Sequence, residues 1–175
     1  MVHRCFLWAL IEGINKTAIG AWRYTAPYND LLDTNAQGNP IKRSSFGWYA
    51  LIERTLTTEA QDGSRGLAGF LRFGTASSDV HQSDYSVSVG LRYIGLLEGR
   101  DTDAAGIAMT SSLPSDKYRS LSNSITEKTM LELTYRFQIK LWLSVQPFVQ
   151  HIFHPGMDST MPDVSLLGFR TELSL

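Results

Sequence analysis

Polar side chains recur at alternate positions of otherwise apolar segments in this sequence. Guanidinium groups donate hydrogen bonds and carboxylates accept them, so a row with both groups suits a neutral, hydroxylated solute better than an anion. The same groups brace the surface that carries them when they pair with one another, and both roles stay open for each residue. The candidate residues for solute contact are Arg23, Glu53, Arg72, Arg92, Glu132, Arg136, Gln146, Gln150 and Arg170.

These side chains need extended strands to position them, because a period of two places successive residues on opposite faces of a sheet. Residues 131–139 alternate between apolar and polar types, and the final segment repeats the pattern from Leu167 to Leu175. The segment 85–93 is the clearest, with Tyr85 and Tyr93 at the two ends of its apolar row. A sheet with one apolar and one polar face is typical of a transmembrane β-barrel, with lipid outside and a polar lumen inside.

Eight strands are predicted, most of them close to the ~9–11 residues that a tilted strand needs to cross a bilayer. They lie at 17–26, 45–57, 66–76, 84–96, 103–111, 127–139, 141–153 and 163–175. Outer-membrane barrels have short periplasmic turns and longer external loops. The long segment 27–44 and the region around Lys117 are predicted to be external loops, whereas 57–65 and 97–103 are predicted to be periplasmic. Residues 77–83 are external but short.

The composition excludes several other classes of protein. Sixteen Lys and Arg residues against seventeen Asp and Glu give no net charge that would favour nucleic acid. The longest apolar run, from Cys5 to Ile11, is seven residues, far below the ~20 of a membrane-spanning helix. Cys5 is the only cysteine, so no internal disulfide can form. Residues 1–15 are interpreted as the remnant of an earlier strand or as a non-native N-terminus, and residues 16–175 as a barrel portion.

Sequence signals for enzyme activity are poor, and no catalytic residue, metal or cofactor is predicted. No nucleophile elbow, P-loop or dinucleotide-binding sequence occurs. His151 and His154 are three residues apart, a spacing that does not bring two metal ligands together on a strand. His154 near Ser159 is the only candidate pair of base and nucleophile. The tryptophans predicted to anchor the membrane interface are Trp22, Trp48 and Trp142.

Several segments of the chain resemble the carbohydrate-selective porins of the bacterial outer membrane (OprB type). The resemblance is carried by AIGAWRYTA, GLAGFLRFGTASSD, GLLEGRDTDAAGIA and ELTYRFQIKLWLSVQPFVQHIFHPG, and is densest toward the end of the chain. The matching residues there are Tyr135, Trp142, Gln146, Pro147, Gln150, Pro155, Gly156 and Gly168. The resemblance implies a sixteen-stranded barrel, of which this chain supplies about half, the C-terminal half.

Two positions depart from the pattern of these porins. Phe148 follows Pro147 where the family carries an acidic residue, which removes a carboxylate from the lumen. Leu175 ends the chain where family members generally end in Phe. The terminal residue is expected to matter for recognition by the barrel-assembly machinery, although Leu still supplies an apolar group.

The predicted function is that of part of an outer-membrane porin for passive diffusion of carbohydrates such as glucose. Its expected partners are a monosaccharide or other small sugar, outer-membrane lipid and the barrel-assembly machinery, and a homotrimer is compatible with it. One alternative is a closed, eight-stranded structural or adhesive barrel without a channel, since the interior of so narrow a barrel is filled by side chains. A soluble all-β binding domain is the other alternative, and it requires a second sheet that covers the apolar face.

Overall fold

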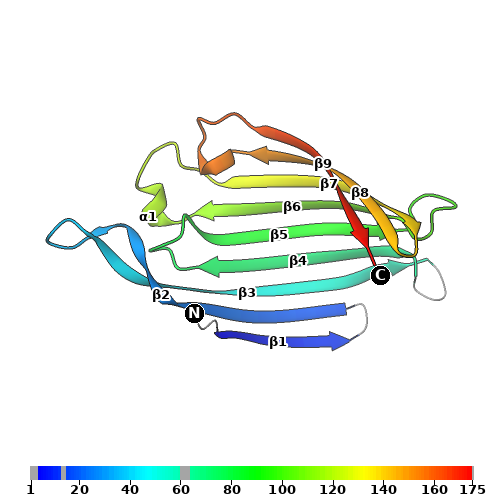
Figure 1. Ribbon diagram of the computed structural model, residues 1–175, viewed down its shortest axis with the longest axis horizontal. Coiled ribbons are helices and arrows are strands. Elements are labelled where there is room, and N and C mark those ends of the chain that lie inside the picture. Colours follow the sequence, from blue (N-terminus) through cyan, green and yellow to red (C-terminus); the bar gives the residue numbers. More distant parts are fainter. Residues whose placement is uncertain (1–3, 13–14, 60–63, 175) are drawn as a thin grey trace.

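The computed structural model describes residues 4–12, 15–59 and 64–174 of the chain. Within these ranges the strands form a single antiparallel sheet in which every strand pairs with its neighbours in sequence (Figure 1). The strands are β1 (Arg4–Glu12), β2 (Asn15–Thr34), β3 (Pro40–Thr58), β4 (Gly66–Ala76), β5 (Ser83–Ile94), β6 (Ala104–Pro114), β7 (Lys128–Lys140), β8 (Leu143–Phe153) and β9 (Val164–Leu173). The predicted all-β antiparallel meander is therefore confirmed.

The eight strands predicted from the sequence correspond to β2 through β9. β1 lies in the segment that was interpreted as a strand remnant or a non-native N-terminus, and it pairs with β2 from Arg4 to Glu12. Two short helices lie in loops at the same end of the sheet, α1 (Asp116–Arg119) and the 3-10 helix η1 (Pro155–Met157). The last residue of the chain and residues 60–63 of one predicted turn lie outside the described residues.

No helix in the described part of the chain is long and apolar enough to span a membrane.

The largest difference from the predicted strands concerns residues 27–44, which were predicted to be a loop. β2 and β3 continue through most of this segment, with Pro27 paired to Ser44 and Asn29 paired to Lys42. Register shifts on both sides of these pairs accommodate the proline, which has no N–H to donate. Only the tip, 35–39, is a turn, in which the Asn35 side chain accepts hydrogen bonds from two backbone N–H groups. The turn-forming residues therefore indicate the tip of a long hairpin.

One face of the sheet is apolar and exposed. The pairing register joins five side chains across β3 to β7, and each of them is between 38% and 49% exposed. They are Ile52, Leu71, Val89, Met109 and Leu131. A second row continues to β9 through Leu91, Ile107, Leu133, Val149 and Leu167. Such a continuous apolar surface is unfavourable in water and suits the hydrocarbon of a bilayer.

The sheet has almost no hydrophobic interior of its own. Among the side chains that the structure describes, only Ala18 and Met157 are buried and hydrophobic. No second sheet packs on the apolar face, because all the described strands belong to the one sheet. The structure therefore gives no support to the soluble all-β alternative, whose apolar face would have to be covered.

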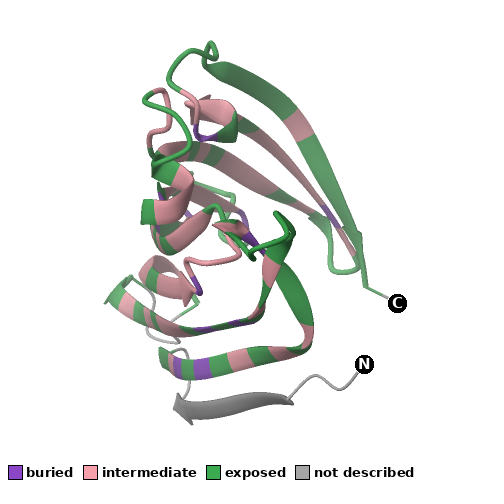
Figure 2. Ribbon diagram, turned by 90° about the vertical axis from the view of Figure 1, so that its left-hand side faces the viewer, coloured by how far each residue is buried: buried purple, intermediate pink, exposed green. Residues whose placement is uncertain are grey.

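The two outermost strands are open edges. β1 pairs only with β2, and β9 pairs only with β8, so within the described residues the sheet does not close on itself. Figure 2 shows the described strands from the end, as an open arc. This differs from the closed eight-stranded alternative, in which the first and last strands would be paired.

We expect the chain to aggregate when it is expressed alone. Unpaired N–H and C=O groups along β1 and β9 cannot be satisfied in hydrocarbon, and in water the same edges pair with those of other copies. Size-exclusion chromatography in detergent and a gel with and without heating measure this. A monodisperse, heat-modifiable species would contradict the expectation and favour a closed barrel.

Candidate pore wall

Eight of the nine candidate residues lie on the same face of the sheet, which we call the inner wall. Glu53 on β3, Glu132 on β7 and Gln150 on β8 belong to one row of paired residues that crosses β4, β5 and β6. The other five candidates are each an even number of positions along their strand from the residue in this row. Side chains spaced in this way point to the same face of the sheet, so these five also lie on the inner wall. These are Arg72, Arg92, Arg136, Gln146 and Arg170.

The inner wall is the concave face of the sheet. A cavity of about 470 Å³ lies against it, lined both by Phe70 of β4 and by Glu172 of β9. Side chains from strands so far apart in the sheet line one cavity only if the sheet curves toward them, as the arc in Figure 2 shows. The polar face is therefore inside the curve and the apolar face is outside it.

Ion pairs link several of the arginines on the inner wall to glutamates. Arg170 donates to Glu132 at 3.2 Å, and Gln150 donates to the same carboxylate. Arg136 lies 3.4 Å from Glu172. A third cation, Arg72, lies 3.5 Å from Glu53. All these pairs are partly exposed, so each contributes at most about 1 kcal/mol to stability and serves mainly to orient the side chains.

Arg92 differs from the other arginines of the inner wall. No ion pair to it is present in the described part of the chain, and its side chain lines the cavity together with Thr134, Gln146 and Glu172. A guanidinium, a hydroxyl, an amide and a carboxylate thus border one space. Donors and acceptors at such spacing can replace the water that hydrates a hydroxylated solute.

Arg23 is the exception, because the structure places it on the outer face, contrary to the prediction. It pairs with Phe46, two residues from Trp48, and both of these aromatic side chains are exposed on the apolar side. Its guanidinium lies 3.4 Å from the Ser44 hydroxyl on the neighbouring strand. The prediction assumed that Trp22, adjacent in sequence, faces lipid, whereas Trp22 lies on the inner wall.

Four aromatic rings on the inner wall lie over glycines of the adjacent strand. Phe70 covers Gly90, and Phe148 covers Gly168. The other two pairs are Tyr49 over Gly20 and Trp22 over Gly47. Because glycine has no Cβ, each ring can lie close to the backbone and leave the lumen open. The alternation of polar and apolar residues does not reveal this arrangement, whereas an aromatic residue directly opposite a glycine on the adjacent strand would indicate it.

Two of these rings also lie beside arginines. The Arg170 guanidinium is 4.4 Å from the centroid of Phe148, and that of Arg72 is 5.1 Å from the centroid of Phe70. These distances are within the range of cation–π contacts. Phe148 thus positions the guanidinium of Arg170 on the inner wall.

We expect Gly168→Ala to narrow the pore. A Cβ at this position would lie 2.5 Å from the Phe148 ring, which must then move from the wall into the lumen. Single-channel conductance of the complete barrel should fall. Gly74→Ala is the matched control, since the nearest atom to its Cβ is the Ser86 hydroxyl at 3.2 Å. The double variant Gly168→Ala/Phe148→Ala should regain the parental conductance, and a single variant that conducts like the parent would contradict the proposed displacement.

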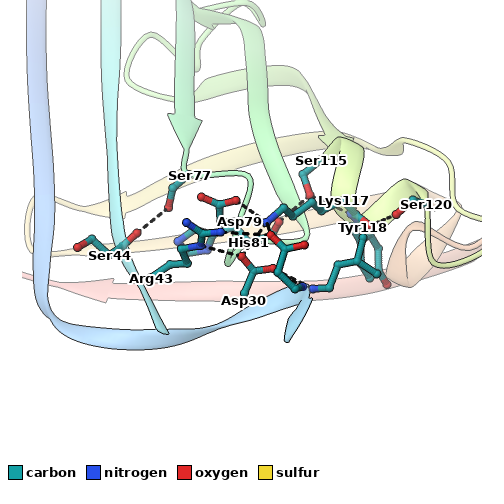
Figure 3. Close-up of polar contacts among 12 residues, drawn as sticks. Asp30, Arg43, Ser44, Ser77, Asp79, His81, Ser115, Lys117, Tyr118 and Ser120 are labelled. Carbon is teal, nitrogen blue, oxygen red and sulfur yellow. Dashed lines mark hydrogen bonds and ion pairs between the residues drawn. The ribbon is translucent and has the colours of Figure 1, made fainter. Parts of the chain in front are cut away.

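A cluster of charged residues joins three loops at the end of the sheet that carries α1 (Figure 3). The Lys117 ammonium lies 2.7 Å from Asp30, 2.8 Å from Asp33 and 2.6 Å from Asp79. Arg43 binds the first two of these carboxylates at 3.0 and 3.2 Å. We call these five residues the loop latch. They belong to the β2–β3 hairpin, the β4–β5 loop and the helix α1.

The environment of the loop latch shifts the pKa values of its members. Burial raises the pKa of Asp30, but hydrogen bonds from Lys117, from the backbone N–H groups of Asp33 and Leu32 and from Arg43 outweigh it and hold the pKa below the usual value. Hydrogen bonds to the three aspartates raise the pKa of Lys117. An aspartate whose pKa is lowered in the folded state stabilises the fold at any pH above the ordinary pKa of the group. This stabilisation is lost only as the pH falls through the lowered pKa. The latch therefore persists through mildly acidic conditions.

The two histidines considered for metal binding or catalysis have separate polar partners. His151 contacts Ser165 at 2.9 Å, whereas His154 Nδ1 lies 3.1 Å from the Glu127 carbonyl oxygen. His154 makes no hydrogen bond to Ser159. No group of three metal-binding side chains is present in the ranges that the structure describes.

Comparisons with known proteins agree with this geometry. Residues 13–175 match the model of the family described as carbohydrate-selective porin, OprB family. Porin B of Pseudomonas aeruginosa (strain PAO1) is 21% identical over 180 residues, which cover 88% of this chain and 40% of that protein. The chain thus spans less than half of this relative.

Two solved structures share the fold. The high-pH structure of Pseudomonas putida OprB aligns with a TM-score of 0.83 at 22% identity, covering 98% of this chain and 47% of that one. The low-pH structure of the same protein gives a TM-score of 0.55 at 18% identity, covering 97% and 49%. One assignment follows from the apolar outer face, the polar concave wall and the family match over residues 13–175. This chain belongs to the carbohydrate-selective porin (OprB) family of bacterial outer-membrane β-barrel proteins, and is not an enzyme.

Proposed function

We propose that the chain forms the C-terminal half of an outer-membrane pore through which small neutral carbohydrates such as glucose diffuse passively. The observation that carries the proposal is the concave wall, where Arg92, Gln146 and Glu172 border one cavity and the neighbouring arginines are paired with glutamates. A wall of this kind offers many hydrogen bonds to a neutral solute without a strong electrostatic potential of one sign.

The energetics follow from the exchange of hydrogen bonds. Each contact between a sugar hydroxyl and the wall replaces a comparable contact with water, so the net gain is on the order of 1 kcal/mol or less. Binding of this strength lowers the entry barrier without trapping the solute, which conduction requires. Phe70 and Phe148, which lie over glycines of the wall, add apolar surface for the faces of a pyranose ring. No cofactor takes part in this mechanism.

The orientation proposed for the chain has the end that carries α1 outside the cell and the turn between β7 and β8 in the periplasm. The two longest connections between described strands, 115–127 and 154–163, lie at the α1 end, and long connections are typical of the external side of outer-membrane barrels. Lipid would cover the outer face, and the barrel-assembly machinery would insert the complete barrel. A homotrimer is compatible with the exposed outer face.

Liposome swelling tests the proposal. The complete barrel is reconstituted, either as a longer natural protein or as a chimera in which this chain follows the N-terminal half of Pseudomonas putida OprB. Glucose should swell these liposomes far faster than protein-free ones, and a tetrasaccharide should swell them more slowly. Assembled, heat-modifiable barrels that admit no glucose would overturn the proposed function.

A further inference from the structure

The loop latch ties three loops that are distant in sequence to one ammonium group. Asp30 and Asp33 lie on the β2–β3 hairpin, Asp79 lies in the β4–β5 loop, and Lys117 lies on α1. A backbone hydrogen bond from Leu31 to Asp79 also joins the hairpin and the β4–β5 loop. Lys117 is therefore the point at which the three segments are held together (Figure 3).

Burial makes the latch different from an ordinary surface ion pair. The Asp30 side chain is fully buried, and Lys117 is only 22% exposed. Three carboxylates face two cations in the cluster, so removal of the lysine leaves an excess of negative charge around a buried carboxylate. Breaking one partner of a buried pair is far more disruptive than breaking a surface pair, because the remaining charge is uncompensated.

The segments that the latch holds lie over the inner wall. His81 of the β4–β5 loop packs edge-on against Trp22, an inner-wall residue, with 5.8 Å between ring centroids. Its Nε2 lies 2.7 Å from the hydroxyl of Ser45, which is also on the inner side of β3. From the side of α1, Ser115 donates a hydrogen bond to the carbonyl of His81. Figure 2, viewed from this end, shows the β2–β3 hairpin on the concave side of the arc.

We propose that Lys117 determines the size limit for solutes, because it fastens the β2–β3 hairpin, the β4–β5 loop and α1 together over the mouth of the pore. The proposal rests on the proposed function, since a size limit requires a pore. In it Lys117 is a positioning residue that touches no solute. Without its ammonium the three aspartates repel one another, the loops separate, and the mouth widens.

The test compares Lys117→Met with Lys42→Met in the complete barrel. Both variants remove one positive charge from the same end of the sheet, but the Lys42 ammonium contacts Asn29 and not the latch. Swelling rates are measured with glucose and with a trisaccharide, and heat-modifiability confirms that each barrel has assembled. In Lys117→Met the ratio of trisaccharide to glucose rates should rise about threefold or more, with higher single-channel conductance, because the constriction is relieved. In Lys42→Met the ratio should stay at the parental value.

Two further measurements separate the possible failures. Asp79→Asn removes a different member of the latch and should also raise the ratio of trisaccharide to glucose rates. The proposal can therefore still be tested if Lys117→Met assembles poorly. Proteinase K should cut the β2–β3 hairpin faster in Lys117→Met than in Lys42→Met, independently of transport. If the parent barrel transports glucose and both latch variants keep its size limit, the proposal is overturned. A parent barrel that does not transport glucose overturns the proposed function and the size limit together, and the protease assay then decides whether the latch itself exists.

Discussion

Val89→Arg is expected to abolish assembly of the barrel. Val89 lies near the middle of β5 on the apolar face, 43% exposed and paired with Leu71 and Met109 on either side. An arginine on the lipid face near the bilayer midplane costs ~2–4 kcal/mol. The described partners of Val89 on the adjacent strands are apolar, so they offer no carboxylate to offset that cost. The amount of heat-modifiable protein in the outer membrane measures the effect.

Ala108→Arg is the depth-matched control for this substitution. Ala108 is adjacent in sequence to Met109, the partner of Val89, but it points to the inner wall and pairs directly with Glu132. A new guanidinium there meets water and a carboxylate, so the barrel should assemble. Ser88→Arg, which is also directed inward, is a weaker control because Arg72 lies directly opposite. Equal assembly of the Val89 and Ala108 variants would show that the two faces have been assigned the wrong way round.

Charge substitutions on the inner wall are expected to change ion selectivity more than substitutions in the loops. Arg92→Ala removes the arginine that has no described ion pair, and should shift the reversal potential toward cations on the order of 10 mV in a salt gradient. Arg136→Ala and Arg72→Ala should act in the same direction, since each leaves a glutamate on the wall without its cationic partner. Phe148→Asp should give a comparable shift, because it places a carboxylate beside Arg170. Planar-bilayer recordings measure all four.

Arg119→Ala is the appropriate loop control. Arg119 is exposed on α1 and takes no part in the loop latch, whereas Lys117, on the same helix, does. It should leave both ion selectivity and glucose swelling at the parental values. If the three inner-wall alanine variants also conduct and swell like the parent, the arginines only brace the wall and the solute has no contact with them.

The strands were predictable from the sequence because alternation is a local property. In β5 the apolar residues at 85, 87, 89 and 91 alternate with small or charged ones, and the structure places the two sets on opposite faces. The same rule failed for Arg23, where both faces of β2 carry bulky apolar residues. Trp22 lies inward because Gly47, twenty-five positions along the chain, leaves room for its ring. The glycine that decides the orientation of Trp22 lies on the neighbouring strand, so the sequence of β2 alone does not predict it.

The loop latch was even less accessible from the sequence. Asp30 and Lys117 are separated by 87 positions, and their contact depends on how three loops fold together. Charged residues in polar loops ordinarily indicate solvated surface, and Lys117 was accordingly predicted to lie in an external loop. The extension of β2 and β3 beyond the predicted strands is what brings Asp30 and Asp33 to α1.

The near absence of a buried apolar interior changes what a truncation of a large side chain would measure. In a soluble protein the cost of Leu→Ala combines lost transfer energy with the energy of the void left behind. Leu133 is 62% exposed on the outer face, so its removal leaves no enclosed void, and fluid acyl chains fill the space. The cost should then follow the thickness and composition of the surrounding membrane. The tolerance of this protein to mutation on its outer face is thus a joint property of the chain and of the lipids around it.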